Sequence, residues 1–397
     1  MTKQPLDDIR VLDLSRVLAG PYCTMMLADL GAEVIKVEQP GRGDESRQWG
    51  PPFVGGESAY FLGINRNKQD ITLNLQHERG RQLVRELVPH ADVLVENFKL
   101  GSMEEWGLGY ESLKALNPRL VYCNISGYGN DGPKAGLPGY DFILEAEAGF
   151  MSLNGPVEGP PMRAPLAIID LTTGMFAATA IIAALRVRDS TGIGQRVDLS
   201  LLESQVAWLA TVASNYWVGG KPPRRFGNGH GTVVPYEVFK AKDDFLALGV
   251  GNDSQFRRVC QALNRPEMAD DARFASNPKR VENRPQLIEM MQAEFETADA
   301  DEWVSRLRPL GVPIGRINSV DRVLNDPQVL HRQMVVEVEH PTAGPVRVVG
   351  VPYKFSETPA LIKSAPPTLG QHTGAVLQRL LGYSAEDIER LRAADVI

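Results

Sequence analysis

Arg10–Glu38, with the sequence RVLDLSRVLAGPYCTMMLADLGAEVIKVE, is the stretch that decides the fold. It begins with a short β-rich run, Arg10–Ser15. Apolar residues then follow at helical spacing over Pro21–Gly31, and the glycine at its end is typical of a helix terminus. Glu33–Glu38 is a second β-rich run. The stretch therefore predicts a strand, a helix and a second strand.

The same alternation continues toward the middle of the chain. We expect strands over Asp70–Leu75, Asp92–Glu96 and Leu120–Ile125, and a helix over Glu78–Val88. Strands that alternate with helices are typical of an α/β domain whose mostly parallel sheet is covered by helices. The sequence predicts this fold class for the N-terminal half.

The second half of the chain predicts a further, smaller domain. Two predicted helices, Ala177–Val187 and Leu199–Trp217, lead to a linker rich in Gly, Pro and Arg over Gly219–Thr232. A hairpin over Tyr236–Gly251 and helical segments to about residue 310 follow. These elements indicate a smaller α+β domain over about 225–330, and the last segment of the chain fits either domain by its pattern alone.

Composition and charge exclude several classes of protein. The chain has 397 residues, of which 43% are hydrophobic and 23% charged, and this excludes disordered and fibrous proteins. Lys and Arg number 42 against 49 Asp and Glu, so the formal net charge is -7. We therefore expect neither nucleic acid nor an anionic membrane as a main partner, because both bind basic surfaces.

Cysteine use and the N-terminal residues indicate the compartment. Cys23, Cys123 and Cys260 are far apart and odd in number, so they predict neither a disulfide framework nor a zinc ribbon. The first residues lack the basic and then apolar pattern of a secretory signal. The longest apolar stretch, Met175–Leu185, is far below the ~20 residues that a membrane helix needs. We expect a cytoplasmic protein without a membrane span.

The turn after the first predicted strand, RVLAGP, is a candidate phosphate-binding loop. A dinucleotide site would carry GxGxxG at this turn and an acidic residue at the end of the second strand. Gly20 stands alone and Pro21 opens the helix, although Glu38 does occupy the place of the acid. The turn fits a plain helix start, with Pro in the first turn, better than it fits an NAD(P) site.

Five basic residues lie between positions 36 and 68 and are interleaved with glycines, as in GRGDESR. They are Lys36, Arg42, Arg47, Arg66 and Lys68. One interpretation is a pocket for a polyanionic ligand in an otherwise acidic protein. The other is a solvated loop in which the charges balance. The sequence leaves both interpretations open.

Asp170 lies between a strand-like apolar pair, Ile168–Ile169, and the Ala-rich predicted helix. It fits the N-cap of that helix, where Asp is strongly preferred. The same placement fits a catalytic role, because a helix N-terminus favours a negative charge and a carboxylate attacks as a nucleophile only when it is ionised. Asp170 is therefore either a simple cap or a candidate nucleophile.

The run Gly227, Asn228, Gly229, His230 and Gly231 holds three glycines in five residues. Its backbone N–H groups can approach an oxyanion or cover a reactive intermediate, but a flexible turn between domains fits the same residues. The six histidines show no metal-binding spacing, and we expect no metal site. The chain also lacks a GxSxG elbow and a Cys–His signature of hydrolases.

Motifs that follow one another along nearly the whole chain carry a family resemblance. They are LDLSRVLAGPYCTMMLADLGAEVIKVEQPGRGDESR, NRNKQDITLNL, ADVLVENF, LNPRLVYCNISGYGNDGP, GYD, IIDLTTG, TGIGQRVDLSLLES, GNGHGTVVPYEVF, DDARFASNPKRVENR, VPIGRINS, DPQV and LGQHT. With these motifs the chain resembles the class III CoA-transferases, the group that includes formyl-CoA transferase and carnitine CoA-transferase.

The resemblance implies a large Rossmann-like CoA-binding domain over 1–218, a small α+β domain over 225–330, and a C-terminal segment, 331–397, that returns to the large domain. It implies an interlocked homodimer, no prosthetic group, and CoA and acyl-CoA as substrates. By the same resemblance Asp170 is the catalytic nucleophile and Gly227–His230 form a substrate loop. The positions implied to contact CoA are Val17, Leu18, Ala19, Gln39, Leu73, Asn97, Phe98, Lys99, Tyr140 and Asp141.

Some positions depart from formyl-CoA transferase. That enzyme has glutamine where this chain has Leu18, and basic residues where it has Gln39, Glu105 and Pro138. Formate and oxalate therefore do not follow as substrates, and other residues must hold part of the CoA phosphates. The glycine run, GNGHG, is also shorter than the family's.

Two alternatives to a transferase remain. The α-methylacyl-CoA racemases share the fold and the aspartate, but they carry histidine before aspartate in a GHD motif that here reads Gly139–Tyr140–Asp141. A tyrosine with a pKa of ~10 is a poor substitute for an imidazole near ~6.5, so the transferase is favoured. A non-catalytic CoA-binding protein of the same fold is disfavoured by the intact Asp170.

We therefore expect an enzyme that moves CoA from an acyl-CoA donor to a carboxylic acid through an aspartyl anhydride and an aspartyl-CoA thioester on Asp170. Backbone N–H groups at the helix start after Asp170, or from Gly227–Gly231, are expected to stabilise the oxyanions. Lys221, Arg224, Arg225 and His230 place positive charge beside the glycine run. This charge predicts short dicarboxylic acids as substrates.

Overall fold

The structure is a computed structural model that describes residues 3–397. Its contacts divide the chain into two compact units. The large unit comprises the chain up to Phe150, residues 164–213 and residues 327–397, and the small unit comprises residues 151–163 and 214–326. Residues 151–163, which the sequence places in the large domain, thus group with the small unit, and the segment after residue 331 groups with the large unit.

A six-stranded sheet forms the centre of the large unit, and neighbouring strands in it are parallel. The strand order is β5-β2-β1-β6-β7-β8. The strands are β1 Arg10–Asp13, β2 Glu33–Glu38, β5 Lys68–Thr72, β6 Val93–Glu96, β7 Val121–Ser126 and β8 Arg196–Ser200. This arrangement confirms the predicted α/β class with a parallel sheet.

The strand order reverses between β1 and β6. From β1 the chain builds outward through β2 to β5, and from β6 it builds outward in the other direction through β7 to β8. In open parallel sheets a ligand crevice forms at the carboxyl ends of the strands where the order reverses. The loops after Asp13 and Glu96 are therefore the expected location of a site.

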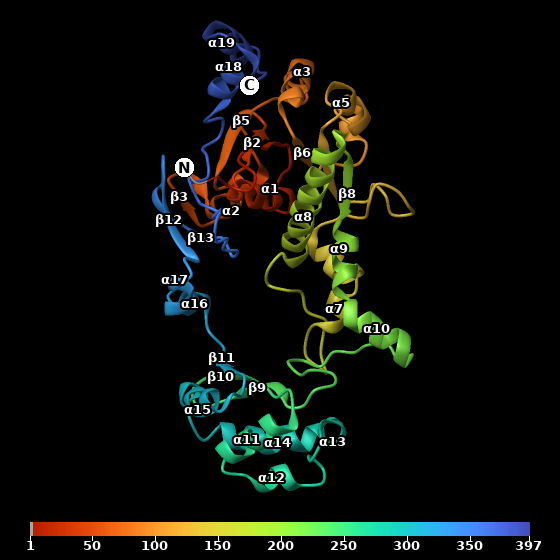
Figure 1. Cartoon of the computed structure of the whole chain (residues 1–397), viewed down its shortest axis with the longest axis vertical. Coiled ribbons are helices and arrows are strands. Elements are labelled where there is room, and N and C mark those ends of the chain that lie inside the picture. Colours follow the sequence, from red (N-terminus) through yellow and green to blue (C-terminus); the bar gives the residue numbers. More distant parts are fainter. Residues whose placement is uncertain (1–2) are drawn as a thin grey trace. The chain divides into compact units, whose positions relative to one another are not determined.

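Helices cover both faces of this sheet (Figure 1). One face carries α1 Ala19–Asp29, α6 Asp141–Glu147, α8 Ile168–Thr191 and α9 Leu201–Trp208. The other face carries α3 Glu78–Leu87, α5 Tyr110–Leu116, α18 Thr373–Leu381 and α19 Ala385–Ala393. Alternate strand residues supply the two cores, so that buried Val11 packs in the first and buried Leu12 in the second.

α8 is the central helix of the first face and packs against α1 (Figure 1). Gly174 permits the close approach, because a Cβ atom there would lie 2.7 Å from the Ala19 carbonyl oxygen. α8 has 24 residues and begins at Ile168, earlier than the Ala-rich run predicts. By length and composition α8 alone among the described helices could cross a membrane, but half of its most apolar stretch is buried, as in a core helix.

The prediction of one helix over Leu199–Trp217 is wrong. Its first residues complete β8, and the rest forms α9 and a separate helix, α10 Ala210–Gly219. Ser200 begins α9, since its hydroxyl accepts a hydrogen bond from the N–H of Glu203 at 3.1 Å. The Ser-x-x-Glu spacing of a capping box is the sequence signal for this helix start.

The C-terminal segment completes the second face and bonds to the edge strand β5. The Thr72 N–H donates to the Thr373 hydroxyl at 2.9 Å, and the Asn74 N–H donates to the Val396 carbonyl at 2.8 Å. The shorter helices of the large unit are α2 Ala59–Ile64, α4 Ser102–Glu105 and α17 Pro327–His331. Two hairpins also belong to it, one of β3 Phe53–Val54 and β4 Glu57–Ser58, the other of β12 Val335–His340 and β13 Gly344–Val349. The helices α7 Phe150–Leu153 and α10 cross the boundary between the two units.

The small unit has its own sheet, in the order β11-β10-β9, and its own core. Its elements are β9 Tyr236–Lys240, β10 Phe245–Gly249, α11 Asp253–Ala262, α12 Glu267–Asp270, α13 Asn277–Glu282, α14 Arg284–Phe295, α15 Ala300–Leu307, β11 Ile314–Arg316 and α16 Val320–Leu324. Phe239, Phe295 and Trp303 form an aromatic cluster in the core. The antiparallel pairing of β9 with β10 confirms the predicted hairpin.

Candidate active site

Loops at the carboxyl edge of the parallel sheet enclose a cavity of about 630 Å³ within the large unit. They follow β1, β6 and β7, so the cavity is built where the strand order reverses. Most of the sequence-predicted positions line it, namely Val17, Leu18, Ala19, Asn97, Phe98, Lys99, Tyr140 and Asp170. We call it the Asp170 cavity.

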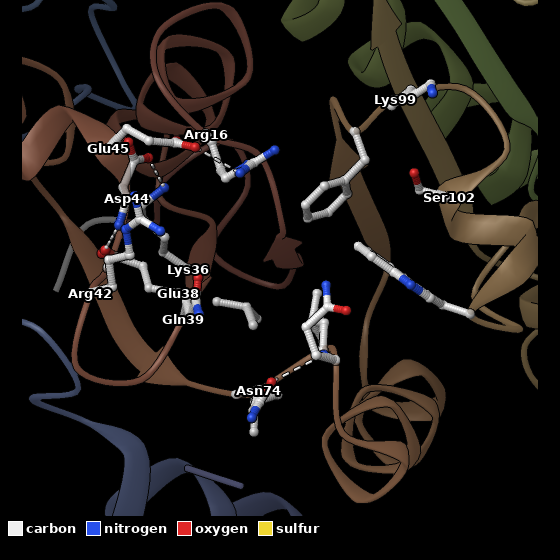
Figure 2. Close-up of a pocket in the computed structure, with 17 residues that line it drawn as sticks. Arg16, Lys36, Glu38, Gln39, Arg42, Asp44, Glu45, Asn74, Lys99 and Ser102 are labelled. Carbon is white, nitrogen blue, oxygen red and sulfur yellow. Dashed lines mark hydrogen bonds and ion pairs between the residues drawn. The ribbon is translucent and has the colours of Figure 1, made fainter. Parts of the chain in front are cut away.

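A second cavity, of about 290 Å³, shares Arg16, Glu45, Phe98 and Lys99 with the first. It lies over the ends of β2 and β5, and the predicted positions Gln39 and Leu73 line it (Figure 2). We call it the Gln39 cavity. Of the predicted CoA-contact positions, Asp141 alone lines neither cavity.

Asn97 ties the two central loops together. Its side-chain carbonyl accepts from the Arg16 N–H and its amide donates to the Arg16 carbonyl, both at 2.9 Å. The loop after β6 therefore fixes the loop after β1 through both groups of one amide. The Arg16 guanidinium stacks over the Phe98 ring at 4.9 Å and pairs with Glu45 at 2.8 Å.

Asp170 lies in the first turn of α8, not at its N-cap. The N-cap position is Ala167, which has no side chain able to cap. The side chain of Asp141 caps the helix instead, because its Oδ2 accepts from the N–H groups of Ile169 at 2.8 Å and Asp170 at 3.1 Å. The carboxylate of Asp170 is thereby free to face the cavity that it lines.

Burial, followed by the charge of Asp141, raises the pKa of Asp170 to about 7. This is opposite to the effect expected of a helix N-terminus. Burial is the larger cause, and Asp141 adds to it because its carboxylate already satisfies the N–H groups of this turn and brings a negative charge to the same place. Asp170 therefore titrates near neutral pH, as carboxyls at functional sites often do.

The expected oxyanion donors on α8 are engaged elsewhere, which corrects that prediction. Ile169 and Asp170 donate to Asp141, and the Leu171 N–H donates to the Ala167 carbonyl at 3.1 Å. The N-terminus of α1 offers N–H groups instead. Its N-cap, Leu18, provides no side-chain cap, and Leu18 and Ala19 line the Asp170 cavity.

The loop that leads into α1 is fixed by a buried ion pair. Val17 has a φ of 67°, in the left-handed region that is unfavourable for a β-branched residue. Its N–H donates to both carboxylate oxygens of Asp44, at 3.2 and 3.1 Å. Asp44 in turn pairs with the Lys36 ammonium at 3.0 Å, and both side chains are fully buried. This buried pair fixes the backbone that faces the cavity.

The basic residues between 36 and 68 are mostly partners in buried ion pairs. Both sequence-based interpretations, a pocket for a polyanion and a solvated loop, are therefore wrong for most of them. Besides Lys36, the pairs are Arg47 with Glu38 at 2.8 Å, Arg66 with Asp29 at 2.6 Å and Lys68 with Asp13 at 3.0 Å. They are neither solvated nor free to bind a ligand. Arg42 differs, because it is exposed, lines the Gln39 cavity and forms no ion pair within residues 3–397.

The glycine run lies in the small unit and is tied to its own neighbours. The Gly229 N–H donates to the Phe226 carbonyl and the His230 N–H to the Tyr236 carbonyl, so these two groups are not free oxyanion donors. The carbonyl of His230 accepts from Arg284. Gly227–His230 are therefore a bonded loop rather than a loose turn.

Tyr60 and Trp49 are site residues that the sequence analysis missed. Trp49 lines the Asp170 cavity, and the Tyr60 ring packs edge-on against it with 5.0 Å between ring centroids. Burial and then the charges of Asp170 and Asp141 raise the pKa of Tyr60 to about 12, so its phenol stays protonated. Their spacing gives no signal, since α2 and a short hairpin bring them together only in the fold.

Residues 6–373 match the model of CoA-transferase family III. The chain belongs to this family. It is 46% identical over 394 residues to the succinyl-CoA:glutarate CoA-transferase of Mus musculus, with 99% of this chain and 90% of the relative covered. It is 43% identical over 394 residues to the succinate–glutarate CoA-transferase of Agrobacterium fabrum, with 98% of this chain and 97% of the relative covered.

A solved structure described as a CaiB/BaiF family protein from Brucella suis superposes on this family III CoA-transferase with a TM-score of 0.87. The two are 41% identical, and 96% of this chain and all of the other are covered. The protein is thus an enzyme of the transferase class whose substrates are CoA thioesters. No cluster of metal-binding side chains occurs among residues 3–397.

Proposed function

We propose that this CoA-transferase moves CoA from a short dicarboxylic acyl-CoA, such as succinyl-CoA, to a dicarboxylic acid acceptor. The observation that carries the proposal is Asp170, which lines a cavity at the strand-order reversal together with the uncapped N-terminus of α1. The names of the mouse and Agrobacterium relatives support succinate and glutarate as the class of acid.

The first half-reaction places CoA on Asp170. A carboxylate oxygen of Asp170 attacks the carbonyl carbon of the donor thioester, the C–S bond breaks, and a mixed anhydride and CoA thiolate result. The thiolate then attacks the carboxyl carbon of Asp170, and the C–O bond of the anhydride breaks. The donor acid leaves as a carboxylate, and Asp170 becomes an aspartyl-CoA thioester.

The second half-reaction moves CoA to the acceptor. The acceptor carboxylate attacks the aspartyl-CoA carbonyl carbon, and CoA thiolate leaves behind a second mixed anhydride. The thiolate attacks the acyl carbon of the acceptor and releases Asp170 as a carboxylate. Each intermediate stays activated, so the free energy of the thioester is retained as long as the cavity excludes water.

Each attack builds negative charge on a carbonyl oxygen, and we assign its stabilisation to the N-terminus of α1. The Ala19 and Gly20 N–H groups have no bonding partner within residues 3–397, and Ala19 lines the Asp170 cavity. A donor of this kind typically contributes about 10²–10³ in rate. The buried Lys36–Asp44 pair keeps these groups in place through Val17.

The Gln39 cavity is the proposed place for the nucleotide end of CoA. Figure 2 shows Arg42 on one wall and Lys99 on the opposite one. Neither side chain forms an ion pair in the described part of the chain, whereas Arg16 and Lys36 are occupied by Glu45 and Asp44. Arg42 and Lys99 are therefore the cations available for phosphates where the family's basic positions are replaced.

Covalent trapping tests the proposed chemistry. Wild-type protein incubated with succinyl-CoA should form an adduct on Asp170 that hydroxylamine converts to a hydroxamate detectable by mass spectrometry. Asp170→Ala should give no adduct and no transfer, with CoA binding retained. Full transfer by Asp170→Ala would reject the mechanism, and exchange of the α-proton without transfer would favour a racemase.

Steady-state kinetics test the nucleotide contacts. Arg42→Ala should raise KM for succinyl-CoA about tenfold, the typical value of one charge-assisted hydrogen bond, and leave KM for glutarate unchanged. Arg347→Ala is the matched control, because Arg347 is an exposed arginine of β13 that lines neither cavity. An unchanged KM for succinyl-CoA in Arg42→Ala would show that Arg42 does not bind CoA.

We also propose the interlocked homodimer that the family resemblance implies. Exposed apolar side chains support an interface: Trp217 and Val218 on α10 are 76% and 91% exposed, and Phe176 and Ile182 on α8 are each 39% exposed. Side chains of this kind mark protein interfaces when they form large patches. The three cysteines are free and buried, which fits the predicted cytoplasmic compartment.

A further inference from the structure

The start of α8 is held by a residue distant in sequence. Two successive N–H groups, those of Ile169 and Asp170, donate to one oxygen of Asp141, which is the first residue of α6. The chain itself supplies no cap at Ala167. The main chain of the proposed nucleophile is thus bonded directly to the Asp141 side chain.

We propose that Asp141 is a positioning residue for Asp170 and not a CoA contact, an assignment that rests on the proposed function. Asp141 fixes the first turn of α8 so that the Asp170 carboxylate faces the cavity. It lines neither cavity, whereas its neighbour Tyr140 lines the Asp170 cavity and is 71% exposed. The GYD motif then has two functions: the tyrosine faces the ligand and the aspartate holds the nucleophile.

The two carboxylates also act on each other through their charges. After burial, the charge of Asp141 is the cause that raises the pKa of Asp170. Other charged or titratable groups lie on the elements that surround the two carboxylates. They are Tyr60 on α2, Tyr22 on α1, Glu145 and Glu147 on α6, Glu203 on α9, and Arg16, Glu45, Lys99, Tyr128 and Tyr140 around the Asp170 cavity. Asp141 thus both orients Asp170 and makes it a stronger base.

Two substitutions separate these effects. Asp141→Asn keeps a side-chain oxygen that accepts from both N–H groups but removes the charge, and Asp141→Ala removes both. Glu147→Gln is the matched control, because Glu147 is an exposed carboxylate on the same helix that bonds to Lys134 and Tyr128 and not to α8. The readouts are the pH profile of kcat/KM, KM for succinyl-CoA, and Tm.

For Asp141→Asn we expect the acid limb of kcat/KM to move to lower pH by roughly one unit, with KM for succinyl-CoA within twofold of wild type and Tm nearly unchanged. For Asp141→Ala we expect the same shift, a fall in kcat of about 10–100-fold and a Tm lower by about 1–2 °C, the usual effect of a lost cap in a chain of this size. Glu147→Gln should behave as wild type.

A change in CoA binding without a change in the pH profile would contradict the proposal. A tenfold rise in KM for succinyl-CoA in Asp141→Asn, with the acid limb unmoved, would overturn the proposal and show that Asp141 binds CoA. Trapping of the Asp170 adduct in wild type is run alongside. Its absence would reject the proposed function, while the Tm difference between Asp141→Asn and Asp141→Ala would still test the cap.

Discussion

The ionisation of Asp170 links its burial to its chemistry. A pKa of about 7 means that the carboxylate is the minority form below neutral pH, yet attack needs that form. We therefore expect kcat/KM for succinyl-CoA to fall about tenfold for each pH unit below 7. A profile measured from pH 5 to pH 9 checks this, and a rate that stays level down to pH 5 would contradict it.

The same pKa predicts a cost in stability. The pKa of Asp170 is about 7 in the folded protein against 3.8 as its ordinary value, so its contribution to stability is present below about pH 4 and is lost as the pH rises through 7. Asp170→Asn should then raise the free energy of unfolding at pH 8 by up to about 4 kcal/mol and have little effect at pH 4. Denaturant titrations at the two pH values measure the difference, and equal effects at both would contradict the assignment.

The buried Lys36–Asp44 pair is expected to be essential to folding. Removing one partner of a buried pair leaves an uncompensated charge, and here that charge also holds the Val17 N–H. Lys36→Met should therefore destabilise the protein by about 3–5 kcal/mol. Adding Asp44→Asn to Lys36→Met should recover part of the loss. A change below about 1 kcal/mol in Lys36→Met would show that the pair is dispensable.

At the scale of elements, the sequence predicts best where local pattern decides. The run EVIKVE predicts β2 with its observed bounds, because a buried parallel strand needs only a short apolar run between breaks. The start of α8 is missed for the opposite reason. The Ile168–Ile169 pair looks like a strand, and the group that caps the helix, Asp141, lies far away in sequence.

The candidate site shows the same contrast between features that local sequence predicts and contacts that form only in the folded chain. The loops after β1 and β6 are predictable, since a parallel α/β sheet places the carboxyl ends of its strands at one edge. The partners of the basic residues are not, because Asp13 meets Lys68 and Asp29 meets Arg66 only once the strands are paired. Without those contacts the sequence could not distinguish buried pairs from a free anion site, and Arg42 could not be singled out.

The basic segment before the glycine run yields a prediction about the acid. Arg225 donates to the carbonyls of Pro156 and Gly159, at 3.1 and 2.7 Å, so it holds the loops of the small unit. Arg224 stacks on the Phe226 ring at 5.1 Å and is the better candidate to bind the non-reacting carboxylate. Arg224→Ala should lower the preference for succinyl-CoA over butyryl-CoA by one to two decades, or ~1.5–3 kcal/mol.

The ratio of kcat/KM for the two donors measures this preference, with Arg347→Ala as the control. Arg225→Ala is expected to lower Tm rather than to change the ratio. Equal kcat/KM values for the two donors in wild type would contradict the dicarboxylate proposal. A strong preference that survives in Arg224→Ala would keep the acid class and reject Arg224 as its cause.

At the scale of the whole molecule, the proposed dimer determines how the protein comes apart. Interlocked subunits cannot separate without breaking tertiary structure, so dissociation and unfolding should occur in one transition whose midpoint depends on protein concentration. Sedimentation at nanomolar concentration should show dimers only. A folded monomer under those conditions would contradict the interlocked arrangement.

The hydrogen bonds from β5 to the C-terminal segment have a consequence for synthesis on the ribosome. Domains usually begin to fold from the N-terminal side while translation continues. Here β5 bonds to Thr373 and the adjacent Asn74 to Val396, and α18 and α19 cover one face of the sheet. A nascent chain therefore carries an apolar sheet face that α3 and α5 cover only in part until α18 and α19 emerge, and it should depend on a chaperone during that interval more than a protein whose sheet is covered by neighbouring sequence.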